Sequence, residues 1–113
     1  MIIIYHNPMC INAKRCIKIL ETKFEEAYDV KREGLDLSEE KLKDILKLLN
    51  CKPGDLIRTN QSIWRTLFKF LDFTDEELIK IMLKYPLLIK GPIVINGNKA
   101  VIGRPPEQIL NIL

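Results

Sequence analysis

The chain opens with an apolar run of strand length that leads through a proline-bearing turn into a pattern of helical period. Residues 2–5 are Ile-Ile-Ile-Tyr, and Pro8 follows in the turn. Beyond it, apolar residues recur with helical spacing at Ile11, Cys16, Ile17 and Leu20. This pattern predicts a first strand followed directly by a helix that ends near Thr22.

The next segment alternates polar and apolar residues and predicts a second strand. Residues 24–30 read FEEAYDV. Strand, helix and strand in this order predict a parallel pair joined by a right-handed crossover. Gly34 then interrupts the pattern, and either Asp36 or Ser38 can cap the helix that follows.

The middle third of the chain has helical period. A link with the sequence LIRTN at residues 56–60 separates two amphipathic helices, and Thr74 with Glu77 forms a capping-box pattern that opens a third. Pro86 ends this third helix. The apolar faces of the first two helices consist of Leu42, Ile45, Leu46 and Leu49, and of Ile63, Trp64, Leu67, Phe68 and Leu71.

The last third changes to strand period. Residues 92–95 and 99–102 flank the sequence Asn-Gly-Asn, which predicts a hairpin because Asn and Gly tolerate positive φ. A short terminal helix containing Ile109, Leu110 and Leu113 follows. The order β-α-β, helical insertion, β-β-α is that of a thioredoxin-like fold of the α/β class, with a mixed four-stranded sheet. We expect a single domain over residues 1–113, with its core at about 1–35 and 86–113 and the insertion at about 36–85.

Composition narrows the class of protein. Hydrophobic residues make up 47% of the 113 residues and charged residues 29%, as in soluble globular domains. No apolar run reaches the ~18 residues of a membrane span, and the first strand follows Met1 directly, so we expect a cytoplasmic protein without a membrane partner. A formal net charge of +3 suits a small anionic substrate. The lysines are scattered among acidic residues, which argues against direct binding of nucleic acid.

The three cysteines indicate free thiols. Their number is odd, their spacing is irregular and no secretory signal precedes them, so a disulfide framework is not expected. A metal site is not expected either, because the spacings of His6, Cys10, Cys16 and Cys51 match no zinc template.

Cys10 is the candidate nucleophile. It lies at the predicted strand-to-helix turn, where unpaired backbone N–H groups and the helix dipole favour a thiolate, and Lys14 and Arg15 add positive charge. The competing interpretation is a small buried hydrophobe. Ala13 excludes a Cys-x-x-Cys dithiol, and Cys16 stands where a Cys-x5-Arg phosphate loop needs arginine. The pattern favours a monothiol nucleophile.

Four motifs resemble the landmarks of the glutaredoxin-linked arsenate reductase (ArsC) family, which also includes the Spx transcription regulators. They are YHNPMC at residues 5–10, LIRTN at 56–60, PLLIKGPIV at 86–94 and GRP at 103–105. The resemblance implies a thioredoxin-like fold in which a cysteine attacks arsenate and arginines hold the oxyanion. It implies no bound cofactor, with glutathione and glutaredoxin as the reductant.

Carried over by motif, the resemblance assigns the nucleophile to Cys10 and its neighbouring histidine to His6. The oxyanion-binding arginines fall on Arg58 and Arg104, and forked, permanently charged donors suit a tetrahedral oxyanion. Surface arginines are also common without a binding role. His6 either helps to deprotonate Cys10 or hydrogen-bonds the turn. Pro92 corresponds to the cis-proline that faces the active thiol in this fold, although a trans-proline at a strand start is the alternative.

The sequence departs from the family pattern at two positions. Gly91 stands where arsenate reductases have an arginine, with Lys90 as the nearby cation, so one oxyanion ligand is missing. Ala13 replaces a serine near the thiol, whereas Lys14 retains the positive charge of a family arginine.

The resemblance leaves three functions open. The first is a thiol-dependent oxidoreductase that acts on an oxyanion or on a thiol substrate, with recycling by an external thiol. The second is an Spx-like regulator that binds RNA polymerase without a Cys-x-x-Cys switch. The third is a protein that has kept the fold and lost the chemistry.

Overall fold

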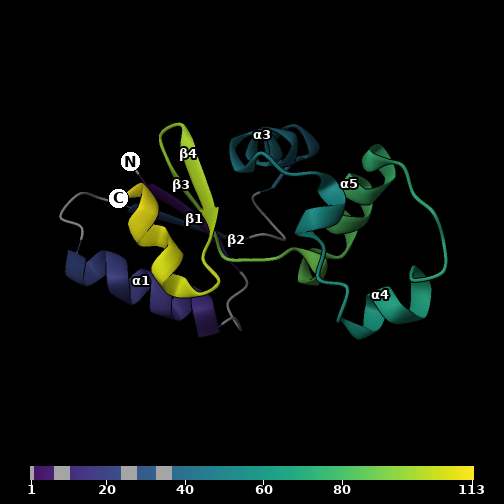
Figure 1. Cartoon of the computed structure of the whole chain (residues 1–113), viewed down its shortest axis with the longest axis horizontal. Helices are drawn as coiled ribbons and strands as arrows, with labels where there is room; N and C mark the ends of the chain where they lie inside the picture. Colours follow the sequence, from purple (N-terminus) through teal and green to yellow (C-terminus); the bar gives the residue numbers. More distant parts are fainter. Residues whose placement is uncertain (1, 7–10, 24–27, 33–36) are drawn as a thin grey trace.

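A mixed four-stranded sheet lies toward one end of the elongated molecule, and the helical insertion extends away from it (Figure 1). The computed structural model describes residues 2–6, 11–23, 28–32 and 37–113. The strand order is β2-β1-β3-β4, with β2 parallel to β1 and both other pairs antiparallel. This confirms the predicted parallel pair and hairpin. The strands are β1 (Ile2–His6), β2 (Tyr28–Arg32), β3 (Ile93–Asn96) and β4 (Lys99–Ile102).

Each face of the sheet is covered by helices. Alternate residues of a strand point to opposite faces, so Ile2 and Ile4 pack in one cluster and Tyr5 in another. The first cluster includes residues of α1 (Ile11–Lys23) and of the terminal 3-10 helix η3 (Pro106–Ile112). On the other face the cluster continues into the insertion, whose elements are α3 (Glu39–Leu49), η1 (Pro53–Leu56), α4 (Ser62–Leu67), α5 (Asp75–Lys84) and η2 (Pro86–Leu88).

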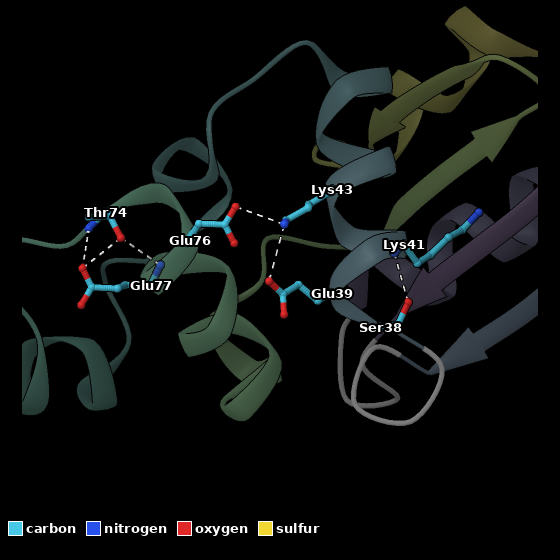
Figure 2. Close-up of polar contacts among 7 residues, drawn as sticks. All are labelled: Ser38, Glu39, Lys41, Lys43, Thr74, Glu76 and Glu77. Carbon is cyan, nitrogen blue, oxygen red and sulfur yellow. Dashed lines mark hydrogen bonds and ion pairs between the residues drawn. The ribbon is translucent and has the colours of Figure 1, made fainter.

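The N-caps of α3 and α5 lie where the sequence predicts them (Figure 2). The Ser38 hydroxyl accepts a hydrogen bond from the Lys41 amide at 3.1 Å, whereas Asp36 lies outside the described residues. The Thr74 amide donates to Glu77 Oε1 at 2.9 Å, and the Glu77 amide donates to Thr74 Oγ1 at 3.2 Å. The predicted capping box is therefore confirmed.

The β3–β4 hairpin is confirmed with a turn of two residues. β3 ends at Asn96 and β4 begins at Lys99, so Gly97 and Asn98 form the turn. Gly97 has φ 62°, a left-handed conformation that favours glycine.

Two element boundaries differ from the sequence prediction by more than one residue. α4 ends at Leu67, so Leu71 lies beyond it and is exposed, as is Leu67 itself. The second strand begins at Tyr28 and extends to Arg32, whereas residues 24–27 of its predicted range lie outside the described residues. Beyond Leu67 the backbone leaves the helical hydrogen-bond pattern, because the Lys69 amide donates to the Trp64 carbonyl and the Leu71 amide to the Phe68 carbonyl.

Candidate active site

The motifs singled out in the sequence meet near the carboxyl end of β1. β1 ends at His6, and its residue Tyr5 pairs with Ile93, the first residue of β3. α1 begins at Ile11. Cys10 lies outside the described residues, so its role as a nucleophile stays a prediction.

The insertion link is hydrogen-bonded to the loop that precedes β3. An isolated antiparallel bridge pairs the two segments. The Arg58 amide donates to the Leu88 carbonyl at 2.7 Å, and the Lys90 amide donates to the Leu56 carbonyl at 2.8 Å. These bonds pair Arg58 with Leu88 and Lys90 with Leu56, so the two predicted oxyanion ligands lie diagonally across one short bridge.

The loop before β3 is joined in turn to the segment that follows β4. The Gly103 amide donates to the Pro92 carbonyl at 2.8 Å, and Arg104 Nε donates to the carbonyl of Gly91. The peptide bond between Gly91 and Pro92 is cis, as expected for this proline. A second cis bond, between Arg104 and Pro105, was not expected from the sequence. We call the three amide–carbonyl bonds of Arg58, Lys90 and Gly103 the main-chain frame.

The predicted cationic side chains differ in exposure. Arg58 and Lys90 are half-buried, whereas Arg104 is exposed and uses one of its N–H groups on Gly91. Lys14 is exposed on the first turn of α1. The main-chain frame therefore connects the segments of Arg58, Lys90 and Arg104. Lys14 is not part of the frame and is positioned by α1.

Lys90 also acts on a cysteine that the sequence did not link to it. Burial is the largest effect on Cys51 and raises the pKa of its thiol, Asp55 raises it further, and Lys90 lowers it. The net direction is upward. The Lys90 ammonium group is therefore within electrostatic reach of Cys51. The sequence gives no signal of this relation, because Cys51 lies outside the four motifs.

Cys16 is a core residue, in keeping with its place in the apolar helical spacing of the first helix. Its side chain is fully buried, and its Sγ lies 3.8 Å from the carbonyl oxygens of both Gly103 and Pro106. It therefore packs beneath the segment that carries Arg104.

Neither a metal-binding group nor a membrane-spanning helix is found within the part of the chain that the structure describes. There, no group of three or more His, Cys, Asp or Glu side chains is arranged to bind a metal ion. No helix within residues 11–23 or 37–113 combines the length and apolar content needed to cross a bilayer.

Comparison with known proteins gives one consistent result. Residues 5–112 match the model of the ArsC family. The chain is 38% identical to an arsenate reductase of Haemophilus influenzae, over 99% of this chain and 98% of that protein. It is 33% identical to the uncharacterized protein YfgD of Escherichia coli, over 97% and 94% of the two chains. The structure of an arsenate reductase from Vibrio cholerae superposes with a TM-score of 0.90 at 31% identity, covering 99% of this chain and 97% of that one.

Proposed function

This chain belongs to the ArsC family, and on that premise we propose that it is a thiol-dependent arsenate reductase with Cys10 as the nucleophile. The observation that carries the proposal is the main-chain frame, which joins the segments of Arg58, Lys90 and Arg104 near the end of β1. Convergent cationic donors beside a reactive thiol are what reduction of an oxyanion requires.

In the proposed reaction, the Cys10 thiolate attacks As(V) and displaces one arsenate oxygen, which leaves as water after protonation. A glutathione thiolate then attacks the Cys10 sulfur. The sulfur–arsenic bond breaks, its electron pair passes to arsenic, and arsenite leaves. Cys10 remains as a mixed disulfide with glutathione, which a further thiol of glutathione or glutaredoxin reduces. In total, arsenate and two thiols give arsenite, one disulfide and water.

The remaining candidate residues have supporting roles in this proposal. Arg58 and Arg104 bind the arsenate oxygens with forked N–H donors, and Lys90 and Lys14 contribute positive charge. His6, the last residue of β1, accepts the thiol proton of Cys10 or orders the turn that follows. The reducing thiols place the reaction in the cytoplasm, where glutathione keeps cysteines reduced.

The direct test is arsenate reduction coupled to glutathione and glutaredoxin, measured for the wild-type protein and for Cys10→Ser. We expect Cys10→Ser to reduce turnover to the uncatalysed background, because serine cannot form the sulfur–arsenic bond. The matched control is Cys51→Ser, which removes a half-buried thiol of raised pKa and should retain wild-type turnover. Activity that survives in Cys10→Ser, or is lost in Cys51→Ser, would contradict the proposal.

A second series identifies the reductant. If glutaredoxin is the thiol that reduces the mixed disulfide, omitting it while keeping glutathione should leave Cys10 trapped with one added glutathione, detectable by mass spectrometry. Full turnover with glutathione alone would show that glutaredoxin is not required.

A further inference from the structure

The space at Gly103 is closed by two neighbouring side chains. A Cβ atom built at this position would lie 2.5 Å from Cys16 Sγ and 3.1 Å from Pro92 Cγ. The backbone conformation does not itself demand glycine, because Gly103 lacks the positive φ that Gly97 has. Position 103 therefore excludes a side chain for lack of room.

The same position controls the start of the Arg104 segment. The Gly103 amide is bonded to the Pro92 carbonyl, and Arg104 Nε donates to the carbonyl of Gly91. A backbone shift at residue 103 therefore changes the place from which the Arg104 side chain extends. Cys16 lies on α1 and cannot easily yield, because it is fully buried with two carbonyl oxygens 3.8 Å from its Sγ.

We propose that Cys16 and Gly103 are positioning residues, a sulfur-to-glycine contact that sets the distance between α1 and the Arg104 segment for oxyanion binding. This rests on the proposed function, in which Arg104 contacts the oxyanion. The role of Cys16 is spatial and involves no redox step.

The test is a double-mutant cycle of Gly103→Ala, Cys16→Ala and the two combined. Gly103→Ala should raise the KM for arsenate by about tenfold or more, the scale of weakening one charge-assisted hydrogen bond, with a smaller change in kcat. Cys16→Ala removes the sulfur that the new Cβ would meet, so the double variant should recover most of the lost affinity. A contact that merely stabilises the fold would lower the amount of active enzyme, and so the apparent kcat, without raising KM.

A readout independent of arsenate is the side-chain N–H signal of Arg104 in a ¹⁵N NMR spectrum. Its Nε bond to Gly91 should be lost in Gly103→Ala and regained in the double variant. Gly54→Ala is the matched control, because a Cβ there meets only Leu78 Cδ1 at an ordinary 3.8 Å. If Gly103→Ala fails to fold while the double variant folds, that result also supports the contact.

Two results would overturn the proposal. One is an unchanged Arg104 signal and KM in Gly103→Ala, which would mean that Cys16 rotates away at no cost. The other is a double variant as impaired as Gly103→Ala. A third outcome is a wild-type protein that fails to reduce arsenate while the Arg104 signal is still lost in Gly103→Ala and regained in the double variant. In that case the proposed reaction is wrong, and the positioning role of Cys16 stands.

Discussion

The three cysteines of this chain differ in their surroundings. Cys16 is fully buried, and burial with the nearby Asp55 raises the pKa of the half-exposed Cys51 thiol despite the opposing effect of Lys90. Cys10 is expected at a helix N-terminus, which lowers the pKa of a thiol. Alkylation at pH 7, mapped by mass spectrometry, should therefore modify Cys10 first. In urea the three cysteines should react at similar rates. Faster labelling of Cys51 or Cys16 than of Cys10 in the folded protein would contradict the prediction.

The pH dependence of Cys51 alkylation tests the causes of its raised pKa. Because the pKa of Cys51 is raised, its thiolate forms at higher pH than that of a free cysteine. Alkylation of Cys51 should therefore begin at higher pH. Asp55→Asn removes a raising charge and should move the midpoint to lower pH. Lys90→Ala removes the lowering charge and should move it to higher pH. An unchanged midpoint in both variants would mean that these two charges lie too far from the thiol to affect its pKa.

By the resemblance of the motifs, Gly91 stands where arsenate reductases have an arginine, so the proposed oxyanion site lacks one contact. One charge-assisted hydrogen bond is worth about 1.5–3 kcal/mol, or roughly 10- to 100-fold in rate. Gly91→Arg should therefore raise kcat/KM for arsenate by up to that factor, if its backbone keeps the carbonyl bond to Arg104. If Lys90 already supplies the charge, Gly91→Arg will do little and Lys90→Ala will abolish activity.

Lys99→Ala, on β4, is the control for the loss of a lysine in these measurements. If neither Gly91→Arg nor Lys90→Ala changes arsenate turnover while Cys10 stays reactive, the substrate is not an oxyanion held at this position.

Of the three α-helices whose N-caps the structure describes, α3, α4 and α5, the last has the most complete local start signal. Thr74→Ala removes the hydroxyl that caps the Glu77 amide and should lower the free energy of unfolding by about 1 kcal/mol, within a range of roughly 0.5–2. Urea denaturation measures this change. Ser62→Ala is the control at α4, whose N-cap Gln61 makes no side-chain cap bond, and it should change stability little. Equal losses of unfolding free energy in both variants would show that the Thr74–Glu77 capping box has no specific effect on stability.

Elements with local chemistry could be predicted from the sequence, and those that depend on tertiary contacts could not. Ser38, Thr74 and the turn at Gly97 act within a few residues of themselves, and all three predictions are confirmed. The apolar spacing that continues to Leu71 misled the helix prediction. Trp64 and Phe68 pack with other aromatic rings. Leu67 and Leu71 are exposed, so the spacing does not continue as the buried face of a helix.

The same distinction applies to the candidate site. The resemblance of four motifs indicated which segments belong together, and the frame joins three of them. The bond from Arg104 to Gly91 and the contact of Cys16 with Gly103 join residues 13 and 87 positions apart. No periodic pattern reports such pairs, because each depends on how whole elements pack.

At the scale of the whole molecule, the insertion and the sheet share one apolar cluster. Tyr5, Ile93 and Ile95 lie in the cluster that includes α3 and α5, while Ile2, Ile4 and Val94 face the other way. The two clusters thus meet back to back on β1 and β3, so unfolding either side removes support from the other.

We therefore expect a single unfolding transition. Trp64 fluorescence reports on the insertion, and pulse alkylation of the buried Cys16 reports on the opposite face of the sheet. Both probes should give the same midpoint in urea, as a two-state domain requires. A Trp64 midpoint at lower urea, with Cys16 still protected, would show that the insertion unfolds on its own.

The main-chain frame has a consequence for how such proteins diverge. Its bonds use amides and carbonyls, and Gly91 likewise contributes a carbonyl to Arg104, a group that every residue carries. Mutation at the rim of the site can therefore exchange one side chain for another while the backbone arrangement persists. Single substitutions can therefore change which anion a relative prefers. Relatives are then expected to share the fold more often than the substrate.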